Sequence, residues 1–262
     1  MAMSTAPVHL TSDVHLGAIP PENERAFLAW LEGAGAEAST VVLNGDLFDY
    51  WFEYRTAIPQ GYTRALGVLA AVVDAGVTVH LMGGNHDWWG GRFLEEEIGL
   101  LFHRAPVDLD LSGRRVHLAH GDGLGPGDRR YKALRSVLRS RPFRWAYRWL
   151  HPDVGSRVAN RASSTEARKS KAERLGGPTE GQIQRSRVLE RWARETLEAR
   201  PELDLVVLGH THIPTLQEPM AGRFYLNCGD WVLHRTFAVL DEGEPPLLLS
   251  WQPDGRHAPF GS

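Results

Sequence analysis

The segment VHLTSDVH, residues 8–15, indicates most clearly how this chain folds. It begins with a short apolar run, as a buried strand does, and it ends in the polar side chains of Asp13 and His15. If the strand conformation continues as far as His15, these two side chains point to the same face, because they are two positions apart. The segment therefore predicts a buried strand that delivers a carboxylate and an imidazole to one place.

Similar apolar runs recur along the chain. Val41–Asn44 and Val77–Met82 are strand-like and lead into glycines, whereas Glu22–Leu31 and Thr63–Val73 carry apolar residues at helical spacing. Alternation of strands and helices predicts an α/β fold in which helices cover a sheet with parallel strands.

The pattern changes after a further strand at Val116–Ala119. From about residue 128 to 200 the chain is basic and predicted to be helical, with proline and glycine breaks. Strand patterns resume at Leu205–Leu208, Phe224–Asn227, Phe237–Leu240 and Leu247–Trp251. We therefore predict a core formed by residues 1–124 and 201–262, with residues 125–200 as a helical insertion.

The charge of the chain is unevenly distributed. The formal net charge is -3, but residues 127–174 contain 14 Lys and Arg against 4 Asp and Glu, and the remainder contains 15 against 28. A basic block favours a polyanionic partner such as a phosphate, a nucleotide, nucleic acid or an anionic membrane surface. A solvated helical face is the alternative.

The composition is that of a globular protein, with 42% hydrophobic and 23% charged residues. The single cysteine, Cys228, excludes an internal disulfide. The first residues lack the basic and apolar regions of a secretory signal, and no stretch approaches the roughly 20 apolar residues that span a bilayer. We therefore expect a soluble, cytoplasmic protein.

Five polar clusters follow predicted strands. They are Asp13-Val14-His15, Gly45-Asp46, Gly84-Asn85-His86-Asp87, His120-Gly121-Asp122 and Gly209-His210-Thr211-His212. Ligands of open α/β sheets bind beyond the carboxyl ends of the strands, so these clusters can meet at one edge. One such residue alone is usually a turn or cap residue, but five clusters in order indicate a site.

The donor set of these clusters is imidazole nitrogen with carboxylate and amide oxygen, without thiolate. This set suits manganese, iron, zinc, cobalt or nickel rather than a structural cysteine–zinc site. Two such ions, about 3.5–4 Å apart, can clamp a phosphate between them. One carboxylate must then bridge the two ions, and Asp46 is the natural candidate because it follows a strand and a glycine.

The ordered series D-x-H, G-D-x-x-D, G-N-H-D, H-G-D and G-H-T-H, over positions 13 to 212, resembles the calcineurin-like metallophosphoesterase superfamily. The resemblance implies a four-layer α/β/β/α sandwich, here with a helical cap insertion. It also implies two divalent metal ions, with manganese expected first, one held by Asp13, His15, Asp46 and His212 and the other by Asp46, Asn85, His120 and His210.

The same resemblance assigns roles to three residues that would not bind metal. His86 would lie near the phosphate and donate to the transition state or to the leaving oxygen. Asp87 would orient His86, and Asp49 would support the metal ligands from behind.

The insertion resembles one branch of the superfamily, the UDP-2,3-diacylglucosamine pyrophosphatases of lipid A synthesis. The cap of that branch carries an Asp-x-x-Tyr element, matched by Asp128 and Tyr131, and an N/S-S-x-E-A-x-x-S-K pattern, matched by residues 163–171 with Ser170 and Lys171 at its end. Gly229-Asp230-Trp231 also resembles the final strand region of that branch.

This second resemblance implies a lipid-like or nucleotide-diphosphate substrate, cleaved at its pyrophosphate to UMP and an acylated sugar 1-phosphate. Asp128, Tyr131, Ser170 and Lys171 would then bind the substrate. One departure stands out, because the best-known members of the branch carry arginine where this chain has His86.

A helix predicted around residues 143–150 has two apolar sides. Phe143, Ala146, Tyr147 and Leu150 form one stripe, and Trp145 and Trp149 lie on the other side among Arg144 and Arg148. The second side suits a lipid chain or peripheral contact with the inner face of an anionic membrane, unless the helix is buried on both sides.

Three other functions stay open. A general phosphodiesterase or nucleotide phosphohydrolase of the same superfamily would use its cap for another ligand. A scaffold that binds partners is less favoured, because all seven predicted ligands are present. Nucleic-acid binding, suggested by the basic, aromatic insertion, is the least favoured. The oligomeric state is left open.

Overall fold

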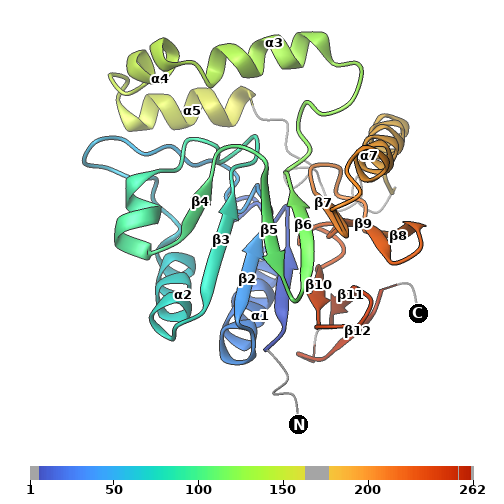
Figure 1. Cartoon of the computed structure of the whole chain (residues 1–262). Coiled ribbons are helices and arrows are strands. Elements are labelled where there is room, and N and C mark those ends of the chain that lie inside the picture. The colour runs from blue at the N-terminus through green and yellow to red at the C-terminus, as the bar shows by residue number, and fades with distance from the viewer. Residues whose placement is uncertain (1–5, 163–176, 253, 261–262) are drawn as a thin grey trace.

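Two β-sheets packed face to face form the centre of the molecule. The computed structural model describes residues 6–162, 177–252 and 254–260. Its sheets have seven strands in the order β12-β11-β10-β1-β2-β3-β4 and five strands in the order β5-β6-β7-β9-β8. Helices cover the outer face of each sheet, which gives four layers (Figure 1). The predicted α/β/β/α sandwich is therefore confirmed.

The first sheet is parallel in its larger part. Its parallel strands are β1 (Val8–Thr11), β2 (Thr40–Leu43), β3 (Thr78–Met82) and β4 (Leu101–His103). Its antiparallel strands are β10 (Thr236–Leu240), β11 (Leu247–Trp251) and β12 (His257–Pro259). Most residues of the parallel strands are buried, because both faces of this sheet are covered.

The outer face of the first sheet is covered by α1 (Pro21–Glu37), α2 (Thr63–Asp74) and a short π-helix, η1 (Phe93–Ile98). The two long helices turn apolar side chains such as Phe27, Trp30 and Leu69 towards the sheet, and these side chains are buried in one core with the strands. Helical spacing of apolar residues in the sequence predicted both helices.

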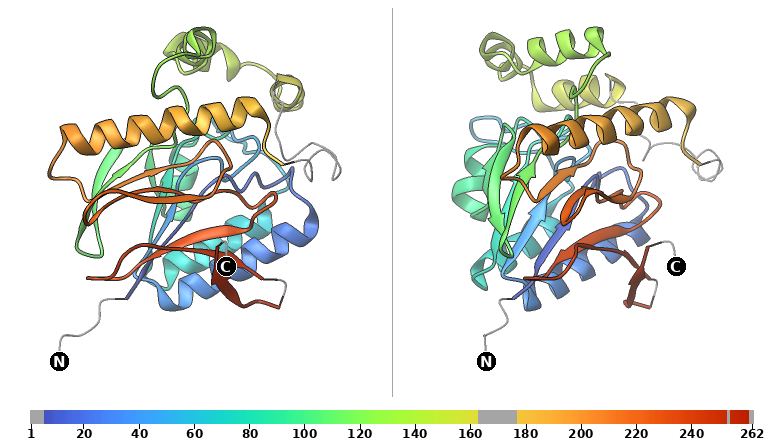
Figure 2. Two further views of the ribbon diagram at one scale, coloured as in Figure 1. Left: turned by 90° about the vertical axis from the view of Figure 1, so that its right-hand side faces the viewer. Right: turned by 45° about the vertical axis from the view of Figure 1, so that its right-hand side comes forward.

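The second sheet has a core on each of its faces. Its strands are β5 (Val107–Leu111), β6 (Arg114–Leu118), β7 (Leu205–Leu208), β8 (Thr215–Met220) and β9 (Arg223–Asn227). On the outer face, α7 (Glu180–Ala199) packs Leu189, Ala193 and Leu197 against β7 and β9, and Figure 2 shows this helix lying across the sheet.

A group of three helices stands above the carboxyl ends of the strands (Figure 1). They are α3 (Arg129–Leu138), α4 (Arg141–Tyr147) and α5 (Pro152–Ala162), and we refer to them as the cap. The predicted insertion at residues 125–200 also includes α7, which packs on the second sheet. The division at residues 125 and 200 stays a prediction.

Several details differ from the sequence-based expectations. β4, β5, β8 and β12 were missed, because they are short or half-exposed and lack a continuous apolar run. The apolar stripe predicted from Phe143 to Leu150 was also wrong in part, because α4 ends at Tyr147 and both Ala146 and Leu150 are exposed. Among the described helices, none has the length and apolar character that a bilayer-spanning segment needs.

A pair of histidines links β3 to β4 and makes stability depend on pH. His80 is buried, and its Nδ1 lies 2.9 Å from Nε2 of His103. Burial, with a smaller contribution from His103, lowers the pKa of His80 to about 4. The folded state therefore resists protonation of His80 between pH 6.5 and about 4, whereas the unfolded chain takes up the proton.

We predict that the free energy of unfolding falls through this pH window, and that His80→Gln removes about 1 kcal/mol of that fall. Urea unfolding of the wild type and the variant at pH 7 and pH 5 measures this fall in the free energy of unfolding. An equal loss of stability in both proteins would show that His80 is not the group responsible.

Candidate metal centre

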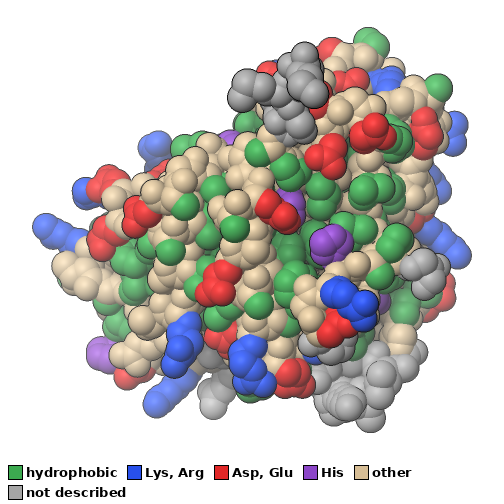
Figure 3. Space-filling model, turned by 90° about the horizontal axis from the view of Figure 1, so that it is seen from below, with side chains coloured by type: hydrophobic (Ala, Val, Ile, Leu, Met, Phe, Trp, Pro, Cys, Tyr) green, Lys and Arg blue, Asp and Glu red, His purple; other side chains and the backbone are tan. Residues whose placement is uncertain are grey.

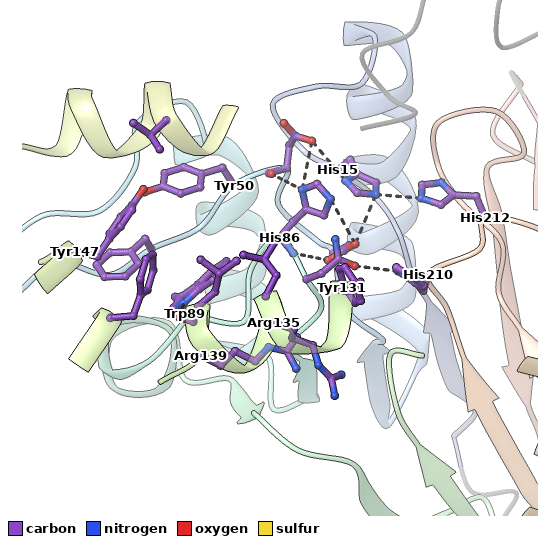
Figure 4. A pocket seen from close by; sticks show the side chains of 18 of the residues that line it. His15, Tyr50, His86, Trp89, Tyr131, Arg135, Arg139, Tyr147, His210 and His212 are labelled. Atoms are coloured by element: carbon purple, nitrogen blue, oxygen red, sulfur yellow. Dashed lines mark hydrogen bonds and ion pairs between the residues drawn. The ribbon is translucent and has the colours of Figure 1, made fainter. Parts of the chain in front are cut away.

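The five predicted motifs meet at the carboxyl ends of the central strands, beneath the cap. The loops after β1, β2, β3, β6 and β7 supply, in that order, Asp13 with His15, Asp46, Asn85 with His86, His120, and His210 with His212. Figure 4 shows the imidazoles of His15, His86, His210 and His212 gathered at one end of a cavity. Parallel strands bring these loops together because their carboxyl ends lie at the same edge.

Most of the gathered residues have a strained backbone. Eight described residues other than glycine have a positive φ, and five of them are predicted metal ligands: Asp13, His15, Asp46, His210 and His212. This region is unfavourable for residues with a side chain, and such strain collects at functional sites. β1 ends at Thr11 and β7 at Leu208, so the strand conformation does not continue through the ligands, and the condition under which Asp13 and His15 would share a face is not met.

The first group of candidate ligand atoms comes from Asp13, His15 and His212. Their ligand atoms lie within 4.8 Å of one another. The Nε2 atoms of His15 and His212 are 3.3 Å apart, and Nε2 of His212 is 3.6 Å from Oδ1 of Asp13. Two imidazole nitrogens and a carboxylate oxygen at these distances can share one cation.

The second group comes from Asp46, His120 and His210. Oδ2 of Asp46 lies 3.2 Å from Nε2 of His120 and 3.9 Å from Nε2 of His15, so one carboxylate oxygen faces both groups. Asn85 joins the second group, because its Oδ1 is 2.9 Å from Nδ1 of His210. These distances suit the bridging position that we predicted for Asp46.

The orientations of the imidazoles fit the binding of divalent cations. Nδ1 of His120 lies 2.9 Å from the carbonyl oxygen of Asn44, and Nδ1 of His212 lies 3.0 Å from Oδ2 of Asp230. When each Nδ1 donates there, each Nε2 keeps a lone pair for a metal. Nε2 of His120 is buried and faces Oδ2 of Asp46 at 3.2 Å, an arrangement that suits two atoms sharing a cation.

Burial and mutual attraction shift the pKa values in opposite directions. Burial alone would raise the pKa of Asp46, but His120, His86 and His15 together hold it well below its usual value. Burial lowers the pKa of His210 to about 3, with a further contribution from His120. Burial would also lower that of His212, but Asp13 and Asp230 raise it to about 9. Protons and metal ions would therefore compete for this site.

His86 and Asp87 make different contacts in the structure. Nδ1 of His86 lies 2.7 Å from the carbonyl oxygen of Asp49, which turns Nε2 to a position 4.0 Å from Oδ2 of Asp46. Asp87 is buried and accepts hydrogen bonds from the N–H groups of Leu47, at 2.7 Å, and Gly84, at 2.8 Å. The backbone carbonyl of Asp49 thus orients His86, a role that we had predicted for Asp87. The catalytic role of Asp87 stays a prediction.

Asp49 lies beside two of the gathered histidines, and its predicted supporting role stays a prediction. Its Oδ1 is 3.6 Å from Nδ1 of His15 and 3.8 Å from Nδ1 of His86. Asp49, His15 and His86 also form a third group of close ligand atoms. The contact between Nδ1 of His86 and the carbonyl oxygen of Asp49 occupies the ring nitrogen nearest the Asp49 side chain. This contact favours the predicted role of His86 beside the metals.

A cavity of about 520 Å³ connects this centre with the cap. One end is lined by the imidazoles and by Asp46, and the other by aromatic and aliphatic side chains (Figure 4). Of the predicted substrate-binding residues, Tyr131 lines the cavity. Asp128 does not, and its Oδ2 lies 3.3 Å from Nη1 of Arg185. Ser170 and Lys171 lie outside the described residues.

Comparison with known proteins agrees with this geometry. The family model for calcineurin-like phosphoesterases matches residues 6–214. The chain belongs to this family. Calcineurin-like phosphoesterases are metal-dependent, and the two groups of ligand atoms described above are the candidate metal positions.

Curated relatives resemble the chain over most of its length. A UDP-2,3-diacylglucosamine hydrolase of Porphyromonas gingivalis is 34% identical, over 89% of this chain and 94% of the relative. Proteins of the same name from Ralstonia nicotianae and Aeromonas salmonicida are 32% and 29% identical, over 87% and 94% of this chain and 84% and 96% of those relatives.

Three features of this phosphoesterase site were missed from the sequence. Asp230 was noted only within Gly229-Asp230-Trp231, yet it holds His212. Arg135 and Arg139 line the cavity and contact Asp122 of the H-G-D motif. Their spacing of four residues on a helix places them on one side, which is the signal that could have found them.

Gly84 leaves the space that the Asp46 carboxylate occupies. A Cβ added to Gly84 would collide with Oδ1 of Asp46 and lie 2.6 Å from its backbone nitrogen. The backbone angles of Gly84 are not of the left-handed kind, so space alone forbids a side chain.

We predict that Gly84→Ala lowers Mn²⁺ affinity by about tenfold or more, because the bridging carboxylate must move. Gly67→Ala is the matched control, since Gly67 lies on α2 with nothing within 4 Å of an added Cβ. That control should stabilise the helix by about 0.5–1 kcal/mol. Equilibrium dialysis measures the affinity, and wild-type binding by Gly84→Ala would contradict the placement of Asp46.

Proposed function

We propose that the chain hydrolyses the pyrophosphate of a UDP-2,3-diacylglucosamine-like lipid, producing UMP and an acylated sugar 1-phosphate. The observation that carries this proposal is a single cavity that joins a candidate two-metal centre to an apolar chamber under the cap. Relatives named UDP-2,3-diacylglucosamine hydrolase, which match nearly the whole chain, support the same substrate class.

The polar end of the cavity provides the groups for hydrolysis of a phosphoric anhydride. Asp13, His15, Asp46 and His212 would hold one ion, and Asp46, Asn85, His120 and His210 the other, with manganese as our first choice of metal. When bound, two such ions neutralise phosphate charge and activate water. All of these ligand residues except Asn85, His210 and His212 are buried, which keeps their geometry fixed.

We infer that His86 transfers a proton. Its Nδ1 contacts the carbonyl oxygen of Asp49, and its Nε2 lies 4.0 Å from Oδ2 of Asp46 in the lining of the cavity. When the ring is protonated, Nε2 can donate to the oxygen of the leaving phosphate.

The apolar end of the cavity suits acyl chains. It is lined by Tyr50, Phe52, Trp89, Leu134, Leu138, Phe143, Tyr147 and Val158. Tyr147 joins the cap to the core there, because its hydroxyl lies 3.2 Å from that of Tyr50 and its ring centroid 4.6 Å from that of Phe52. Each methylene buried in such a chamber contributes about 0.8 kcal/mol, which favours a lipid over a free nucleotide.

The outer side of the cap suits an anionic membrane surface. Trp145 and Trp149 are 67% and 77% exposed, and the neighbouring Arg141 and Arg148 are exposed as well. Tryptophan and arginine together suit the boundary between lipid head groups and acyl chains. By contrast, the face on the far side from the cap carries scattered charges of both signs (Figure 3). We propose that the cap docks on the membrane that holds the substrate.

We predict that the purified protein with Mn²⁺ releases UMP from UDP-2,3-diacylglucosamine, and that Asp46→Asn lowers the rate by about 100-fold or more without changing the fold. Quantifying UMP by chromatography tests this, with circular dichroism as the folding control. Cleavage of a simple phosphodiester without release of UMP would instead favour a general phosphodiesterase of the same family.

We predict that a Trp145→Ala/Trp149→Ala variant binds vesicles containing phosphatidylglycerol about tenfold more weakly than the wild type. Leu101→Ala/Leu247→Ala, which shortens two exposed apolar side chains away from the cap, is the matched control. Vesicle sedimentation measures the bound fraction. Equal binding by all three proteins would remove the membrane-docking role of the two tryptophans.

A further inference from the structure

A buried carboxylate holds two arginines of the cap over the metal centre. Asp122 is 5% exposed, and its Oδ2 accepts from Nη1 of Arg135 at 3.1 Å and from Nη2 of Arg139 at 2.8 Å. Arg135 also donates to the carbonyl oxygen of Asp122. The two arginines lie four residues apart on α3, so the helix presents them side by side.

Each guanidinium keeps donors for a ligand. The described hydrogen bonds of Arg135 all come from Nη1, and those of Arg139 all come from Nη2. Both side chains line the cavity that contains Asn85 and His86, and Figure 4 shows them at the same end of the cavity as Tyr131. The remaining nitrogens of two such forks can bind phosphate oxygens.

Among the described residues, Asp122 is the carboxylate within ion-pair distance of both Arg135 and Arg139. Two guanidinium groups share one carboxylate, although the side chains of Arg135 and Arg139 are only 29% and 18% exposed. Burial lowers the pKa of Arg139, and the attraction of Asp122 offsets only part of that effect. A surplus positive charge held in a half-buried place is stabilised by an anion that enters the cavity.

Arg139 is also fixed relative to the loop that carries Asn85 and His86. Its Nη2 donates to the carbonyl oxygen of Gly84 at 3.1 Å, and its guanidinium stacks on Trp88, 5.0 Å from the ring centroid. An anion on Arg139 would therefore lie at a set position relative to the metal ligands.

We propose that Asp122 holds Arg135 and Arg139 as a preformed site for the second phosphate of a diphosphate, beside the phosphate that the metal ligands receive. The inference rests on the proposed function, because it assigns a place to the part of the diphosphate that is not attacked. It makes the arginine pair a determinant of selectivity for diphosphates over monophosphates.

The test compares two anions on the Mn²⁺-loaded protein by isothermal titration calorimetry. Imidodiphosphate, which resists hydrolysis, reports both phosphate positions, and orthophosphate reports the metal position. We expect Arg135→Gln and Arg139→Gln to weaken imidodiphosphate binding by about tenfold or more, and orthophosphate binding by less than about threefold. Arg130→Gln, an exposed arginine on the same helix, is the matched control and should change neither.

An equal weakening of both anions would overturn the proposal, because it would mean that the pair only anchors α3. If the glutamine variants fail to fold, Arg139→Lys keeps the charge without the fork and should lose imidodiphosphate affinity by an intermediate factor. Selective loss of imidodiphosphate binding in a protein that releases no UMP would support the arginine site while removing the proposed substrate. Release of UMP without the selective loss of imidodiphosphate binding would support the proposed substrate and overturn the arginine site.

Discussion

The structure depends on one constraint, which is that a buried carboxylate must face imidazoles from both halves of the fold. Asp46 follows β2 of the first sheet, whereas His120 follows β6 of the second sheet. Oδ2 of Asp46 lies 3.2 Å from Nε2 of His120. Packing the two sheets face to face brings these loops together. An acid and several imidazoles this deeply buried are costly unless their charges are shared, and divalent cations meet that requirement.

The surroundings of Asp46 follow from the same constraint. Gly45 leaves room for the ring of His120, and Gly84 leaves room for the Asp46 carboxylate. A Cβ at either position would collide with that group. Asp87 binds the backbone N–H groups of the Asp46 loop, which helps to keep that loop in its strained conformation. The cap then closes the cavity over this centre and adds the aromatic chamber and the two arginines of α3. In the proposed function, hydrolysis would take place at the ends of the strands, whereas acyl chains would bind under the cap.

Much of this could be predicted from the sequence, because the central strands are apolar runs whose polar ends carry the motifs. The bounds of β1, β7 and β11 agree with the predicted ones. The left-handed conformation of Asp13 and His15 could not be predicted, since it arises from loops fitting one another across two sheets. The role of Asp87 and the packing of α7 on the second sheet also depend on tertiary contacts. The arginine pair on Asp122 requires knowing where the cap lies.

A crystal structure of the active protein with Mn²⁺, with data collected at the manganese absorption edge, tests the central claim most directly. The account predicts two anomalous peaks, one against Asp13, His15 and His212 and the other against Asn85, His120 and His210, with Asp46 in contact with both. A single peak, or two peaks of which only one touches Asp46, would contradict it.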